Sequence, residues 1–176
     1  GDEGVAEYVI HELVGFLQGY KWDNIGHEIT GLKCGGIGLR TSGTLIAKTL
    51  KFFKADVSYY SKTRKETLEK EFGFTYKDLN TLCSDSEAIF LALNKNVLLL
   101  QKEQFDLMKD KCILFNTSIG PGFDTLALSE WLKNEKHFFF GDTLATIGDK
   151  SLWDLPNTFT INRSSGGNTY QAFHRL

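Results

Sequence analysis

Apolar positions along the chain fall into two kinds of pattern, short continuous runs and longer stretches with helical spacing. The continuous runs predict buried strands, at residues 34–37, 55–60, 87–93, 112–115, 137–140 and 158–161. The helical spacing predicts helices, at residues 5–20, 44–53, 65–72, 78–82, 104–108, 125–132 and from 166 onward. Five or six apolar strands that alternate with helices are typical of a parallel sheet with helices on both faces. We therefore predict an α/β fold, a doubly wound parallel sheet in three layers.

The first predicted helix, within residues 1–20, is apolar around most of its circumference. Only Glu7, His11 and Gln18 form a narrow polar face. A helix this broadly apolar has to be covered on two sides. One cover is its own domain, and we expect the other to be a second copy of the chain or a further domain, with an ordinary core helix as the alternative.

Residues 33–64 contain a strand, a glycine turn, a helix and a second strand. Gly38 and Gly43 occupy the first and third positions of a G-x-G-x-x-G pattern, whose helix N-terminus attracts phosphate. The second position is Arg40, so a side chain stands where the backbone would approach a pyrophosphate. We predict an altered phosphate turn that binds a cofactor through these three residues and through Thr41 and Ser42. Whether the Arg40 guanidinium blocks a phosphate or clamps it stays open.

The second strand ends in a basic loop of Ser61, Lys62, Thr63 and Arg64. In dinucleotide folds an acid at this position binds the ribose 2′-hydroxyl, whereas a basic group accommodates a 2′-phosphate. Because the loop contains no acid, it favours NADP over NAD as the cofactor. A solvated basic loop in front of helix 65–72 is the alternative.

Other candidates come from the remaining strand ends, because parallel strands place their carboxyl ends at one edge of the sheet. The stretches expected there are 92–94, 116–119 and 163–166, together with the residue after strand 137–140. From them we predict five further cofactor-binding residues: Ala92, Leu93, Ser118, Asp142 and Gly166.

Composition limits the classes of protein to consider. The chain has 176 residues, of which 41% are hydrophobic, only 2 prolines and a formal net charge of -2. These values predict a single domain over residues 1–176 and give no electrostatic reason to expect nucleic acid or a membrane as partner.

Cys34, Cys83 and Cys112 lie in or beside apolar runs without C-x-x-C spacing, which predicts buried thiols rather than a disulfide or a metal site. No histidine pairs with a carboxylate at metal-ligand spacing, so we expect no metal. The sequence has neither an apolar run of about 20 residues nor a basic signal-peptide start, and we expect a cytoplasmic protein.

Five segments in a fixed order carry a resemblance to a known family. They are VAEYVIHELVGFLQG, GLKCGGIGLRTSG, YYSKTRKE, LMKDKCILFNTSIG and LPNTFTINRSSGGNT. Nearly the whole chain resembles the Rossmann-type NAD(P)-binding domain of the D-isomer-specific 2-hydroxyacid dehydrogenases. The resemblance implies hydride transfer between nicotinamide and a 2-hydroxy or 2-oxo acid, a dimer contact through the first helix, and a substrate domain that is absent from this chain.

The same resemblance shows that the catalytic positions are changed. The family's arginine follows an N-T-A stretch, and here Asn116-Thr117-Ser118 is followed by Ile119. The family's histidine position is occupied by Arg163, which cannot exchange a proton as a histidine does. Residues 143–148, where the partner glutamate is expected, contain no acid, and the loop at 93–99 is shorter than the family's. We predict no catalytic residue.

Three hypotheses remain open at this point. The chain is the cofactor domain of a dehydrogenase, a nucleotide-binding regulatory module without catalysis, or a dimerisation scaffold that binds no dinucleotide.

Overall fold

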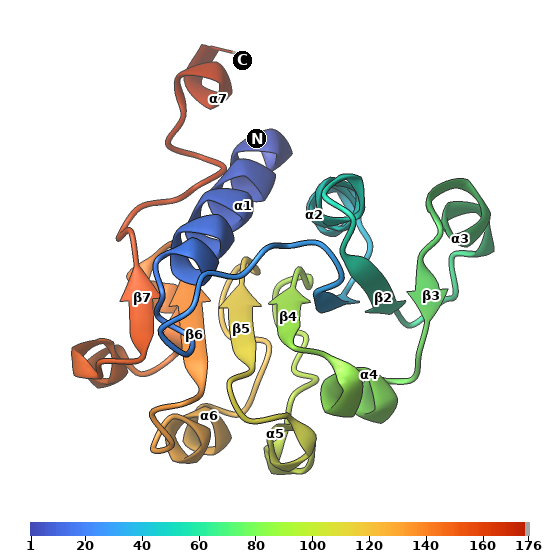
Figure 1. Cartoon of the computed structure of the whole chain (residues 1–176). Helices are drawn as coiled ribbons and strands as arrows, with labels where there is room; N and C mark the ends of the chain where they lie inside the picture. Colours follow the sequence, from blue (N-terminus) through green and yellow to red (C-terminus); the bar gives the residue numbers. More distant parts are fainter. Residues whose placement is uncertain (175–176) are drawn as a thin grey trace.

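Seven parallel strands form one sheet in the computed structural model, which describes residues 1–174 (Figure 1). The strands are β1 Lys33–Ile37, β2 Asp56–Tyr60, β3 Thr75–Tyr76, β4 Ala88–Leu91, β5 Ile113–Asn116, β6 Phe138–Gly141 and β7 Thr158–Thr160. Their order in the sheet is β3-β2-β1-β4-β5-β6-β7, so the direction of winding reverses between β1 and β4. The predicted doubly wound α/β fold is confirmed.

Helices cover both faces of the sheet. One face carries α1 Asp2–Gln18, α2 Thr41–Phe52 and α3 Glu66–Phe72 (Figure 1). The other carries α4 Leu79–Asp85, α5 Lys102–Leu107 and α6 Thr125–Trp131, with two 3-10 helices, η1 Leu144–Ile147 and η2 Lys150–Asp154. A short helix, α7 Tyr170–His174, lies beyond the end of the sheet near the N-terminus of α1 (Figure 1).

Strand β6 shows why apolar runs become central strands here. Successive side chains of a strand point to opposite faces. Phe138 and Phe140 therefore pack against Phe16 of α1, with ring centroids 4.7 and 5.7 Å away, while Phe139 packs against Phe123 on the other face. Each buried phenylalanine stabilises the fold by about 1.5–3 kcal/mol. A run without polar alternation is thus suited only to a strand covered on both faces.

Helix α1 buries most of its apolar surface within its own chain. Val9, Leu13 and Leu17 are fully buried against the sheet and α2. The polar face predicted from the sequence is exposed, and Ile10 and Val14 are only partly buried. A second copy of the chain or a further domain would therefore cover the strip around Ile10 and Val14. This contact stays a prediction.

Four elements differ from the sequence-based expectations. The strand β3 has two residues, and the prediction treated it as a connection. The two 3-10 helices were missed because Leu144, Ile147 and Leu152 are too scattered for a helical pattern. The last helix begins at Tyr170 rather than at Gly166, because residues 164–169 first pack along the N-terminus of α1, where Gly166 accepts a hydrogen bond from the Gly1 amino group.

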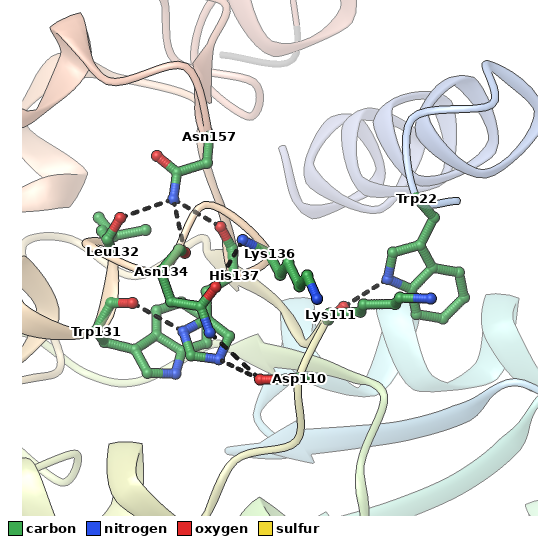
Figure 2. A network of polar contacts seen from close by, with 9 residues as sticks. All are labelled: Trp22, Asp110, Lys111, Trp131, Leu132, Asn134, Lys136, His137 and Asn157. Atoms are coloured by element: carbon green, nitrogen blue, oxygen red, sulfur yellow. Dashed lines mark hydrogen bonds and ion pairs between the residues drawn. The ribbon is translucent and has the colours of Figure 1, made fainter. Parts of the chain in front are cut away.

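A polar network ties the amino ends of β5, β6 and β7 together (Figure 2). The Asn157 amide donates hydrogen bonds to the carbonyls of Leu132, Asn134 and His137 at 2.9, 3.3 and 2.8 Å. The His137 ring stacks on Trp131 at 4.3 Å and donates to its carbonyl at 2.8 Å. His137 therefore has a structural role, and it lies at the edge of the sheet opposite the strand ends that carry the candidate site.

The three cysteines are free and buried, as predicted. Burial raises the pKa of each thiol, to about 12 for Cys83. Thiols held in this state are poor nucleophiles and poor metal ligands.

Candidate functional site

The glycine turn after β1 keeps the geometry that the motif requires. Gly38 has a φ of +96°, and a Cβ there would lie 2.4 Å from the carbonyl oxygen of Ala92. A Cβ on Gly43 would lie 2.2 Å from the Gly38 carbonyl oxygen. Both positions therefore exclude any side chain. The strand, turn and helix are intact although the second glycine is absent.

Arg40 caps the N-terminus of α2 through its backbone alone. Its φ and ψ of -76° and -166° are extended, and its side chain makes no capping bond. The first N–H groups of a helix have no intrahelical partner, so those of Thr41, Ser42 and Gly43 are available to an anion. An exposed guanidinium stands beside them, which gives this end of β1 two kinds of group that attract phosphate.

The basic loop after β2 is held by a three-residue link that involves one of its own cations. Arg64 donates two hydrogen bonds of 2.9 Å to the Glu69 carboxylate and lies over the Tyr76 ring. Tyr59 donates to the same carboxylate at 2.5 Å and accepts from the Lys65 N–H at 2.7 Å. The hydrogen bonds from Arg64, and then from Tyr59, lower the pKa of Glu69 to about 2. Arg64 therefore fastens the loop to α3.

A cavity of about 480 Å³ lies at the carboxyl ends of β1, β2 and β4. Seven of the predicted cofactor-binding residues line it: Gly38, Arg40, Ser61, Lys62, Thr63, Ala92 and Leu93. Lys65 lines it as well, although the sequence placed this residue at the start of a helix. Its signal was present as the last cation of the run Lys62-Thr63-Arg64-Lys65. Arg64 is not among the lining residues, because Glu69 holds it.

Cations in this cavity lack partners of their own. Across residues 1–174, the side chains of Arg40, Lys62 and Lys65 enter no ion pair, and the cavity lining contains no aspartate or glutamate. Leu39, Val97 and Leu99 add apolar surface to the walls. The cavity can hold an apolar ring together with anionic groups, which is the chemistry of a nucleotide.

The remaining predicted residues lie outside this cavity. Ser118 is buried, and its hydroxyl accepts a hydrogen bond of 2.7 Å from the Leu93 N–H. Asp142 is buried as well and accepts from the Ser165 N–H and hydroxyl at 2.8 Å each. Gly166 packs against Gly1 at the start of α1. These contacts stabilise the loops after β4, β6 and β7.

The positions that the family uses for catalysis carry other side chains here. Ile119 is 75% exposed at the end of β5. Arg163 is exposed, and its backbone N–H donates to the Asp142 carbonyl at 2.9 Å. Residues 143–148 include η1 and contain no acid. An isoleucine can neither hold a carboxylate nor move a proton, and an arginine stays protonated.

Two features are absent from residues 1–174, the part of the chain that the structure describes. No cluster of three or more histidine, cysteine, aspartate or glutamate side chains in it is placed to bind a metal ion. None of its helices combines the length and the apolar character needed to cross a bilayer.

The strand order, the glycine turn at the switch point and the cationic cavity beside it define a dinucleotide-binding type of α/β domain. Residues 10–161 match the family described as "D-isomer specific 2-hydroxyacid dehydrogenase, NAD binding domain", and the chain belongs to this family. The resemblance inferred from the five sequence segments is thereby confirmed.

Relatives support the assignment at the level of sequence. The chain is 38% identical to the glyoxylate reductase of Pyrococcus horikoshii over 116 residues, which cover 64% of this chain and 34% of that protein. The glyoxylate reductase of Pyrococcus furiosus is 35% identical with the same coverage. The chain therefore spans about a third of the length of these relatives.

Solved structures agree on the fold. The apo structure of D-lactate dehydrogenase from Escherichia coli has a TM-score of 0.82 at 25% identity, covering 99% of this chain and 60% of that one. D-lactate dehydrogenase from Aquifex aeolicus, in complex with NAD and lactic acid, has a TM-score of 0.83 at 22% identity, with 99% and 63% covered.

Proposed function

We propose that this domain binds a nicotinamide dinucleotide in the cavity at the ends of β1, β2 and β4, that it prefers the 2′-phosphorylated form, and that its own side chains do not carry out hydride transfer. The observation that carries the proposal is the set of three unpaired cations, Arg40, Lys62 and Lys65, around a cavity without an acid. Membership of the NAD-binding family supports the class of ligand.

The preference for NADP rests on charge. A phosphate monoester carries about -1.5 to -2 charges at neutral pH, which NAD lacks at the ribose. Lys62 and Lys65 lie at the end of β2, the position at which dinucleotide folds generally bind the adenosine ribose. An acid that would bind a free 2′-hydroxyl is missing from the cavity lining. The structures of Aquifex D-lactate dehydrogenase and Staphylococcus aureus formate dehydrogenase are complexes with NAD, so the preference distinguishes this domain from those proteins.

The lack of catalysis rests on Ile119, Arg163 and the acid-free segment 143–148. The domain then serves as a nucleotide-binding regulatory module. A second candidate, supported by the share of the glyoxylate reductases that the chain covers, is the cofactor domain of an oxidoreductase whose substrate domain and catalytic groups come from elsewhere. A hydride-transfer assay with glyoxylate on the full-length protein separates the two candidates.

We further propose a homodimer through α1. Ile10 and Val14 are only partly covered, and α2, which packs beside α1, ends in the exposed pair Phe52 and Phe53. Ile10→Glu is expected to halve the mass measured by light scattering, whereas Gln18→Glu on the polar face leaves it unchanged. A monomeric wild type would contradict the dimer and favour a different cover for this strip.

Titration calorimetry with NADPH and then NADH tests the binding proposal. We expect micromolar affinity for NADPH, about -8 kcal/mol, and weaker binding of NADH. Equal affinities would remove the preference for the 2′-phosphate. No heat and no thermal stabilisation with either nucleotide would contradict dinucleotide binding altogether and leave the dimerisation scaffold.

A further inference from the structure

The cavity occupies only one half of the binding edge. A doubly wound dinucleotide fold consists of two mononucleotide-binding halves, one on each side of the switch in strand order. Here the lining residues come from the turns after β1 and β2 and from the loop that follows β4. The ends of β5, β6 and β7 contribute none of them. The space for a ligand thus lies over the first half and stops at the switch point.

The two buried polar side chains at the ends of β5 and β6 are occupied by the chain itself. Asp142, at the end of β6, accepts two hydrogen bonds from Ser165 through Oδ2 and one of 2.9 Å from the Thr143 N–H through Oδ1. Asn116, at the end of β5, donates to the carbonyls of Gly120 and Thr146 and accepts from the Ser118 N–H. A buried group whose hydrogen bonds are already made gains little from a ligand.

At the junction between the halves, the polar groups are likewise bonded to each other. The Ser118 hydroxyl accepts from the Leu93 N–H, which binds the turn after β5 to the turn after β4. At the end of β5 the exposed side chain is Ile119, which is 75% exposed and has no group that could recognise an amide. A carboxamide ring above β5 and β6 would find the buried Asp142 and Asn116 already hydrogen-bonded, and the cavity at the ends of β1, β2 and β4 does not reach it.

The first half has the opposite character. Arg40 and the N-terminus of α2 lie at the end of β1, and Lys62 and Lys65 lie at the end of β2. These are two cationic positions on one cavity, whose lining also includes the apolar Leu39. The arrangement fits a nucleoside that carries two separate phosphate groups, one on each cationic position.

We propose that the site is specific for a nucleoside bisphosphate of the adenosine 2′,5′-bisphosphate type, and that the nicotinamide half of a bound dinucleotide contributes no affinity. This inference rests on the proposed function, because it assigns the recognition of NADPH to one half of the molecule. It also implies that the bisphosphate alone occupies the site as well as the complete cofactor does.

Calorimetry with three ligands tests the inference: NADPH, adenosine 2′,5′-bisphosphate and reduced nicotinamide mononucleotide. We expect the first two to bind within about threefold of each other and the mononucleotide to give no heat at millimolar concentration. Tighter binding of NADPH by about tenfold or more would overturn the inference and leave the proposed function intact. Failure of both NADPH and the bisphosphate to bind would contradict the proposed function itself.

Two variants and one spectroscopic signal sharpen the test. Lys65→Ala should weaken NADPH and the bisphosphate by the same factor, and Ile119→Asp should weaken neither. The nicotinamide fluorescence of bound NADPH should keep the emission maximum of free NADPH, because the ring stays in water. A blue shift on binding, or a loss of NADPH affinity in Ile119→Asp with the bisphosphate unaffected, would show that the second half does hold the ring.

Discussion

The two halves of the binding edge use their polar side chains for different purposes. Over β1 and β2, the side chains of Arg40, Lys62 and Lys65 stand around an open cavity without partners in the part of the chain described. Over β5 and β6, Asp142 and Asn116 are buried with their hydrogen bonds made. Because buried polar groups in folded proteins are almost always satisfied, the satisfied set is sufficiently explained by stability. The unpartnered set is the one that indicates a ligand.

The largest expected effect comes from reversing charge in the half over β1 and β2. Lys62→Glu together with Lys65→Glu should weaken NADPH binding by about a thousandfold, because two charge-assisted contacts of about 1.5–3 kcal/mol each are lost. NADH should lose far less, since it lacks the 2′-phosphate. Calorimetry measures both, with Lys70→Glu on the exposed side of α3 as the control. Equal losses for the two cofactors would mean that these lysines bind no 2′-phosphate.

A smaller effect is expected at the altered turn. If the Arg40 guanidinium clamps a phosphate, Arg40→Gly should weaken NADPH and adenosine 2′,5′-bisphosphate by about ten- to a hundredfold, the equivalent of one charge-assisted hydrogen bond. Thermal unfolding serves as the check that the turn still forms. Tighter binding in this variant would show instead that the side chain obstructs the pyrophosphate.

In the half over β5 and β6, a substitution should change the stability of the fold and leave NADPH binding unchanged. Ser165→Ala removes one of the two hydrogen bonds that Ser165 gives to buried Asp142, and it should lower the free energy of unfolding by about 1–3 kcal/mol. NADPH affinity should stay within a factor of about two of the wild type. Denaturant titration and calorimetry give the two numbers, with exposed Asp154→Asn as the matched control. A clear change in affinity would mean that the two halves are not independent.

The smallest effect concerns the link between Arg64 and Glu69. The pKa of Glu69 in the folded protein, about 2, is lower than that of an unfolded glutamate, so the unfolded state binds the proton more readily. The contribution of Glu69 to stability is therefore complete above about pH 4.5 and is lost as the pH falls towards 2. Glu69→Gln should flatten this part of the pH profile in denaturant titrations. A profile that matches the wild type would show that the link adds nothing to stability.

That link also explains what the sequence could and could not predict about the site. The strand, turn and helix from Lys33 to Phe52 were predictable, because apolar runs and glycines act locally. The role of Arg64 was not, since a guanidinium near the cavity can equally turn to Glu69 on the next helix. Lys65 lines the cavity, and its N–H is held by the Tyr59 hydroxyl, a contact between β2 and the start of α3. Asp142 meets Ser165 across 23 residues, a contact that no local pattern shows.

In the rest of the fold, too, local patterns were predictable from the sequence and contacts between distant segments were not. Runs such as Phe138 to Phe140 predict central strands because they leave no polar face. The 3-10 helices, by contrast, are held by contacts with other elements, such as the hydrogen bonds from the Trp153 indole N–H to the Leu144 carbonyl and from the Thr158 hydroxyl of β7 to the Leu152 carbonyl. Contacts of this kind depend on the assembled sheet, so the sequence gives little warning of them.

The glycines of the turn after β1 have a consequence for redesign. Gly38 and Gly43 both occupy positions where a Cβ would meet backbone within 2.4 Å, so the main chain there still has the shape of a complete phosphate-binding turn. Restoring a glycine at position 40 therefore requires a single codon change and no rebuilding of the loop. In this chain, the turn after β1 and the hydrogen bonds that occupy Asp142 and Asn116 can be altered one at a time. A dinucleotide site can therefore be rebuilt in separate, measurable steps.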